Sequence, residues 1–198
     1  IISVVVGVVL TLPISSAAIC AAVGISGGAV LAGVLDGSIS MDVWNGLALA
    51  GGAATVGCCC NMLGFAVISY PDNGVGGLVA QGLGTSMLQV PNLMRKPVLW
   101  IPPVLTSAIL GPVATCIFQL RNNGAAISSG MGTAGLVGPI GIITGWSNMP
   151  KGYTVDAFDW IGMILVCFIL PVVLSWAIGK FMRKKGWIKE GDLKVDLG

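Results

Sequence analysis

Histidine is absent from this 198-residue sequence, and acidic and basic side chains together make up only 9% of it. Without histidine, the chain cannot assemble a Ser-His-Asp triad or a Cys-His pair. A zinc site would need thiolates alone, and the six cysteines lack the paired CxxC spacing of such sites. We therefore predict no catalytic residues, no metal and no cofactor. The sequence also has no basic segment with interleaved aromatic side chains, so we predict no nucleic-acid partner.

Carboxylates are scarce as well. Glutamate occurs once, at Glu190, and no aspartate lies inside a segment that we expect to cross a membrane. Carriers that are driven by a proton or sodium gradient usually bury a carboxylate or a charge relay. We therefore expect that any transport by this chain does not depend on such a gradient.

Hydrophobic residues, by contrast, make up 55% of the chain, and the mean hydropathy is +0.93. A soluble domain carries about 25% charged residues, so this composition predicts an all-α, multi-pass membrane protein. The uncharged runs 43–70, 97–120 and 160–179 are each long enough to cross a bilayer. We predict a transmembrane domain at 1–179 and a charged cytoplasmic tail at 180–198.

The remaining segments are less regular. Residues 1–35 form either one span with a short re-entrant piece or two crossings. Because the chain begins inside an apolar run, we expect it to be the C-terminal part of a longer protein. Polar loops are predicted at 36–42 and 151–159, and Pro-Asp-Asn-Gly at 71–74 is a strong turn signal.

Two uncharged stretches, 74–91 and 122–150, are too rich in glycine to form uninterrupted helices. Irregular backbone is tolerated at membrane depth only where protein or a water-filled cavity surrounds it. We therefore expect both stretches to form re-entrant hairpins that line a cavity.

The two stretches also carry related motifs, Gly-Leu-Gly-Thr-Ser at 82–86 and Gly-Met-Gly-Thr-Ala at 130–134. The motifs begin 48 residues apart, and preceding Leu-Gly and Asn-Gly pairs recur at offsets of 47 and 50. Each unit consists of a span, a turn and a broken stretch. If the broken stretches are re-entrant, the units have opposite orientations, which is the inverted repeat of many secondary transporters.

Basic residues favour the same topology. With the tail in the cytoplasm, Arg95 and Lys96 also lie inside, and the re-entrant arrangement places 8 basic residues inside and 2 outside. Full crossing of both stretches would move Arg95 and Lys96 outside. We therefore predict a plasma-membrane location with a cytoplasmic C-terminus.

Helix ends that meet at mid-membrane offer free N–H donors, and glycine lets a ligand approach the backbone. The nearby polar side chains are neutral, which suits a polyhydroxy ligand such as a carbohydrate. The alternative is that the small residues only allow close helix packing. The predicted ligand-binding residues are Gln81, Gly82, Gly84, Thr85, Ser86, Asn123, Gly130, Gly132 and Thr133.

Four segments carry a family resemblance: TLPISSAAI (11–19), DNGVGGLVAQGLGTSMLQVPN (72–92), WIPPVLTSAILGP (100–112) and SGMGTAGLVGPIG (129–141). Here the sequence resembles the membrane (enzyme IIC) component of the sugar phosphotransferase system. Within that family it is similar to the branch that includes the perfringolysin O regulator-like proteins. The resemblance covers roughly residues 1–179.

The resemblance implies a homodimeric membrane protein that binds and translocates a carbohydrate. Partner IIA and IIB subunits would phosphorylate the sugar at the expense of phosphoenolpyruvate. Two alternatives remain: a membrane regulator or sensor that keeps the fold without transport, and a carrier or channel for another neutral solute.

Overall fold

The computed structural model describes residues 40–125, 127–147, 149 and 153–195, and every regular element among them is helical. The predictions for residues 1–35 therefore lie outside the described part of the chain. The α-helices are α4 (Met41–Ile68), α5 (Tyr70–Val79), α6 (Val90–Arg95), α7 (Ile101–Pro112), α8 (Ser128–Met131), α9 (Val137–Trp146), α10 (Ala157–Ile164) and α11 (Leu170–Lys184). Short helical turns connect them: η1 (Ala80–Gly84), η2 (Ser86–Gln89), η3 (Pro97–Trp100), η4 (Val113–Ile117), η5 (Ala134–Leu136) and η6 (Leu165–Ile169).

Three continuous helices are long and apolar enough to cross a membrane, namely Met41–Ile68, Pro97–Ile117 and Ala157–Lys184. They confirm that the three uncharged runs expected as spans form helices long and apolar enough to cross a bilayer. The third begins with a capping box, in which the Asp159 carboxylate accepts the backbone N–H of Asp156 at 2.9 Å. This cap starts the helix inside the predicted loop 151–159, and the helix continues past residue 180 into the predicted tail.

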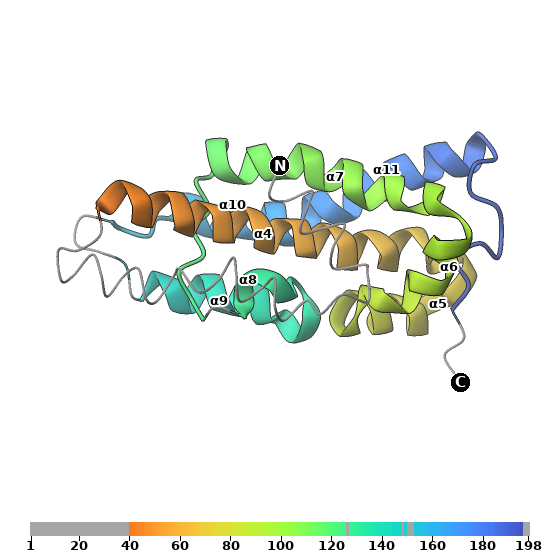
Figure 1. The fold of residues 1–198 in the computed structure, drawn as a ribbon, viewed down its shortest axis with the longest axis horizontal. Coiled ribbons are helices and arrows are strands. Elements are labelled where there is room, and N and C mark those ends of the chain that lie inside the picture. The colour runs from red at the N-terminus through yellow and green to blue at the C-terminus, as the bar shows by residue number, and fades with distance from the viewer. Residues whose placement is uncertain (1–39, 126, 148, 150–152, 196–198) are drawn as a thin grey trace.

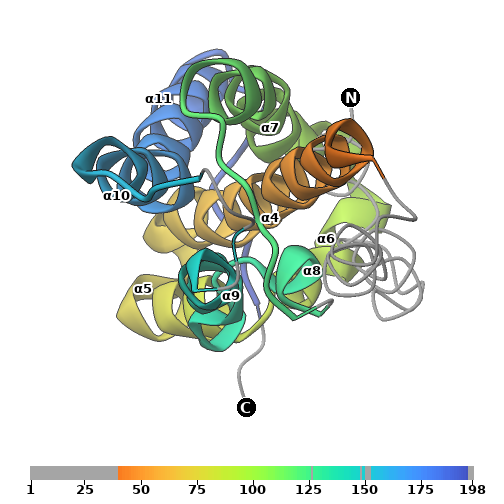
Figure 2. The ribbon, with the colours of Figure 1, turned by 90° about the vertical axis from the view of Figure 1, so that its left-hand side faces the viewer.

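Helix α4 forms the centre of the molecule (Figure 2). Helix α7 and the pair α10–α11 cover one side of it, and α5, α8 and α9 lie on the other. Figure 1 shows α4 and α7 lying lengthwise in opposite chain directions. Most of α4 is buried, whereas much of α10–α11 is exposed. Large apolar side chains that face outward there are Phe158, Trp160, Ile161, Ile164, Ile169, Val173 and Trp176.

The first broken stretch, predicted at 74–91, lies within residues 70–95, which are here called hairpin 1. It comprises α5, η1, η2 and α6. The predicted turn at 71–74 falls at the start of α5, shortly after α4 ends at Ile68. Gly74 nevertheless breaks the helical backbone there with φ +59°. From η1 the chain returns to the C-terminal end of α4, where Leu93 packs with Phe65 and Ile68.

The second broken stretch was predicted at 122–150, and the described residues from 121 to 147 are called hairpin 2. It starts beside the N-terminal part of α4, where the Asn122 N–H donates to the Ala48 carbonyl at 3.0 Å. After α8 and η5 the chain turns back as α9, and Gly145 returns to the backbone of Asn123 and Gly124. The two hairpins therefore have their open ends at opposite ends of α4.

The segment 185–195, called the C-terminal segment, folds back beneath hairpin 1. Its Ile188 and Leu193 are buried in a cluster with Leu93 and Leu99. The Asn73 carboxamide forms two hydrogen bonds with the backbone of this segment. Nδ2 donates to the Leu193 carbonyl and Oδ1 accepts the Val195 N–H, both at 2.7 Å. The residues predicted as a charged tail thus include a packed part of the domain.

Charged side chains gather at the two ends of the helix bundle. Lys96 forms an ion pair with Asp192 of the C-terminal segment. At the other end, the Arg121 guanidinium lies 4.7 Å from the centre of the Tyr153 ring, which in turn contacts Trp44 at the start of α4. Lys96 and the C-terminal segment therefore share one end of the bundle, as the charge count predicted.

Candidate functional site

The two Gly-x-Gly-Thr motifs meet beside the middle of α4. The Thr133 hydroxyl of hairpin 2 donates a hydrogen bond to the Gly82 carbonyl of hairpin 1 at 2.6 Å, and the Thr133 side chain is fully buried. A π-helical turn, η1, presents the Gly82 carbonyl in this direction. Two residues 51 positions apart in the sequence are thus joined by a hydrogen bond. The segments that meet here, 82–86 and 130–134, are called the tips of the hairpins.

A cavity of about 160 Å³ lies between the tips. Four of the nine predicted ligand-binding residues line it: Gly84, Thr85, Ser86 and Gly130. The remainder of its wall is formed by Met62 of α4 together with Met87, Met131 and Ala134. Both motifs therefore contribute to one cavity, which is walled by neutral groups.

Gly132 does not line this cavity. It has φ +51°, and a Cβ added there would lie 2.6 Å from Cβ of Cys58 and 2.8 Å from the Cys59 nitrogen. The Gly138 N–H also donates to the Gly132 carbonyl at 2.8 Å. Glycine at this position lets the tip of hairpin 2 touch the backbone of α4, and Thr133 and Gly82 join that tip to hairpin 1.

Gln81 likewise points away from the cavity. Its Nε2 donates to the Ser69 hydroxyl at 2.9 Å, and its Oε1 accepts from Nε2 of Gln89 at 3.0 Å. Gln89 Nε2 also donates to the Leu193 carbonyl at 3.0 Å. These buried side chains link the end of α4, hairpin 1 and the C-terminal segment.

Asn123 is distant from the two tips. Its Oδ1 accepts the indole N–H of Trp44 at 3.3 Å, near the beginning of α4. The structure therefore brings together seven of the nine predicted residues around the contact of the tips, and leaves Gln81 and Asn123 in separate hydrogen-bonding networks. Their direct contact with a ligand stays a prediction.

The cavity also contains residues that the sequence analysis did not include. Met87 directly follows the first motif and Met131 lies within the second, so their position in or beside the motifs was the available signal. Met62 carried no such signal. Beside it, Oδ1 of Asn61 is buried without a hydrogen-bond partner among the described residues, an arrangement that in proteins calls for an explanation such as a bound water or ligand.

The described residues are helical, with three candidate spans and a cavity between broken helices that is lined by neutral residues, and these features are those of an integral membrane protein. The family model "Phosphotransferase system, EIIC" matches residues 1–195, and the chain belongs to that family. Membership confirms the resemblance noted in the sequence. It implies a membrane location and partner components of the phosphotransfer system. Comparisons with curated proteins and with solved structures gave no match.

Proposed function

We propose that this chain binds and translocates a carbohydrate as the membrane component of a phosphoenolpyruvate-dependent sugar phosphotransferase system. One observation carries the proposal: both glycine-rich motifs line the same cavity, with Gly84 and Ser86 on one side and Gly130 on the other. Family membership supplies the system. In such a system partner IIA and IIB subunits phosphorylate the sugar.

The hairpins are re-entrant in this proposal, and the two units form an inverted repeat. Two contacts support that arrangement. Lys96, at the end of hairpin 1, pairs with Asp192, whereas Arg121, at the start of hairpin 2, stacks on Tyr153 at the other end of the bundle. The protein resides in the plasma membrane as a homodimer, and the C-terminal segment faces the cytoplasm, as the basic residues favour.

The size of the cavity bears on the mechanism. At about 160 Å³ it is smaller than the ~300–1,000 Å³ typical of small-molecule sites. A sugar therefore requires the hairpin tips to separate, which breaks the hydrogen bond from Thr133 to Gly82. Alternate opening toward either end would expose the cavity to one side of the membrane at a time.

Binding by purified protein tests the site. A panel of radiolabelled monosaccharides and disaccharides is measured by equilibrium dialysis against the full chain. Loss of one neutral hydrogen bond in Ser86→Ala should weaken binding of the preferred sugar by about 2- to 13-fold. Ser175→Ala is the matched control, because Ser175 is a buried serine that bonds Thr106 away from the cavity. Equal affinity in both variants would contradict the site.

Transport is tested separately in vesicles that retain the IIA and IIB proteins. Uptake should require phosphoenolpyruvate and should persist when proton and sodium gradients are collapsed, since no carboxylate is expected within the spans. Binding without uptake would indicate a non-transporting regulator. Uptake without phosphoenolpyruvate would indicate a carrier for a neutral solute.

A further inference from the structure

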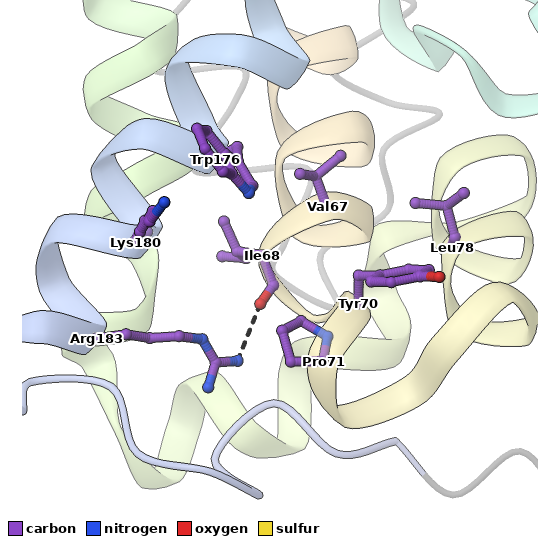
Figure 3. A pocket seen from close by; sticks show the side chains of 9 residues that line it. Val67, Ile68, Tyr70, Pro71, Leu78, Trp176, Lys180 and Arg183 are labelled. Carbon is purple, nitrogen blue, oxygen red and sulfur yellow. Dashed lines mark hydrogen bonds between the residues drawn. The ribbon is translucent and has the colours of Figure 1, made fainter.

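A second cavity, of about 330 Å³, opens between α11, the end of α4 and the start of hairpin 1. Figure 3 shows Trp176, Lys180 and Arg183 of α11 on one side, and Tyr70 and Leu78 on the other. None of the residues that line the cavity between the hairpin tips contributes to this second cavity. It is therefore a separate site on the outer surface of the described part of the bundle.

The lower wall of this cavity is cationic. Lys180 Nζ lies 4.6 Å from the centre of the Trp176 ring. Arg183 Nη2 donates to the Ile68 carbonyl at 3.0 Å and to the Asp72 carboxylate at 2.9 Å. Because Asp72 neutralises one of the two cations, the cavity keeps a net charge of about one positive unit, which matches a single phosphodiester.

The upper wall is apolar and continues onto the surface of the spans. Trp176 and Tyr70 are about half exposed, and Val173 is exposed on α11 one turn closer to the middle of the helix. Lys180 and Arg183 belong to the last turns of an apolar span that ends at Lys184. Aromatic and basic side chains at the end of a span are typical of the level of lipid headgroups.

We propose that this cavity binds one anionic phospholipid. The phosphodiester lies against Lys180 and the free N–H groups of Arg183, and an acyl chain follows the groove formed by Trp176, Val67 and Leu78. Basic pockets between helices at the membrane surface recognise anionic headgroups in this way. A bound lipid would join α11 to the start of hairpin 1, which otherwise meet there through Arg183 and Asp72.

The test uses the full chain in a nonionic detergent. It is titrated with phosphatidylglycerol or with phosphatidylcholine of identical acyl chains, and bound lipids are counted by native mass spectrometry. Wild-type protein should retain one phosphatidylglycerol in preference to phosphatidylcholine. Lys180→Gln should reduce that preference roughly 5-fold, the equivalent of about 1 kcal/mol for one basic residue near an anionic lipid surface.

Lys185→Gln is the matched control. Lys185 also lies over an aromatic ring, that of Phe181 at 5.8 Å, but it does not line the cavity. If both variants show the same reduction in phosphatidylglycerol retention, the lipid is attracted by the basic surface in general and not by this cavity, and the proposal fails. Both lysines are exposed, so neither substitution should disturb folding.

Two further arms separate a lipid from a free anion. Leu78→Trp, which fills the groove, should weaken retention of both lipids. Glycerol phosphate, the headgroup without acyl chains, should not displace bound phosphatidylglycerol at equal concentration. Displacement by glycerol phosphate would show a simple anion site and overturn the assignment to a lipid, as would unchanged retention in Leu78→Trp.

Discussion

The two hairpins resemble each other in sequence, but in the described structure hairpin 2 adds close backbone contacts with α4 to the side-chain hydrogen bonds that both hairpins make. Hairpin 1 is held by side-chain hydrogen bonds, in which Gln81, Gln89 and Asn73 connect it to Ser69 and Leu193. Hairpin 2 also has side-chain hydrogen bonds to α4, such as that from Asn122 Nδ2 to the Thr55 hydroxyl at 2.7 Å, but in addition glycines of α4 and of the hairpin touch main-chain atoms of the other segment. Hydrogen bonds can be exchanged for water one at a time, whereas backbone contacts tolerate no added atom. We therefore expect hairpin 1 to be the easier of the two to move.

The largest expected effect concerns the opposite placement of the open ends. In a protein freed of native cysteines, Arg95→Cys should react with an impermeant thiol reagent only from the cytoplasmic side. Thr154→Cys, in the loop after hairpin 2, should react only from outside. Both positions are exposed in the structure. Labelling of position 95 from outside intact cells would contradict re-entrant hairpins.

The next effect tests the backbone contacts of hairpin 2. A Cβ added at Gly52 would overlap the Leu120 carbonyl oxygen, so Gly52→Ala must displace the chain that leads into the hairpin. We expect a loss of about 3 kcal/mol or more, at the upper end of overpacking costs, measured by unfolding in detergent.

Gly46→Ala is the control for that substitution. Gly46 is on the same helix and has no heavy atom within 4 Å of the added Cβ. It should raise stability by about 0.5–1 kcal/mol, because alanine is the better helix former. Equal destabilisation of both variants would mean that glycine in α4 does not act through this contact.

A smaller loss is expected when a hydrogen bond of hairpin 1 is removed. Gln89→Leu leaves Oε1 of Gln81 buried without its donor, whereas the Leu193 carbonyl keeps Asn73. The cost should be about 1–3 kcal/mol. Trypsin should also cut at Lys189 and Lys194 before the spans unfold, because the C-terminal segment loses one of its attachments.

Gln119→Leu serves as the control for Gln89→Leu, since Gln119 is exposed and its side chain accepts a surface hydrogen bond from Arg121, away from hairpin 1. Its stability should stay within about 0.5 kcal/mol of wild type. If tryptic cleavage of the Gln89→Leu protein coincides with global unfolding, hairpin 1 and the C-terminal segment do not detach as a unit.

The smallest effect is the pH dependence of the Lys96–Asp192 contact. Burial alone would raise the pKa of Asp192, but hydrogen bonds from Lys96 and the Lys189 N–H hold that pKa below its ordinary value. Because the pKa of Asp192 is lower in the folded than in the unfolded protein, its ionised form stabilises the fold at pH values above the unfolded pKa. This stabilisation is lost as the pH falls through the pKa of the folded protein.

The Asp192→Asn protein should therefore melt slightly below wild type at neutral pH, by a free energy of about 1 kcal/mol or less for this partly exposed pair. The difference should vanish in acid, below the pKa of the folded protein. If the two proteins still differ in stability in acid, the effect of Asp192→Asn comes from altered packing and not from the lost charge.

The sequence predicted the helical class and the three described spans well, because uncharged runs near 20 residues leave few alternatives in lipid. It also predicted that Gly84, Ser86 and Gly130 belong together, since the repeat placed them at matching positions. It placed Asn123 and Gln81 at the same site only by proximity along the chain. Their hydrogen-bond partners, Trp44 and Ser69, depend on how the hairpins pack against α4.

By itself, then, the sequence determined which segments are long and apolar enough to cross a membrane, where the helices are interrupted, and that the two broken stretches carry related motifs. These properties depend on the local composition of each segment. Only the tertiary structure decided that Gly132 packs on Cys58 while Gly130 faces a cavity, and that Leu193 anchors hairpin 1. Contacts between residues more than 70 positions apart depend on the relative placement of whole helices, which no local pattern specifies.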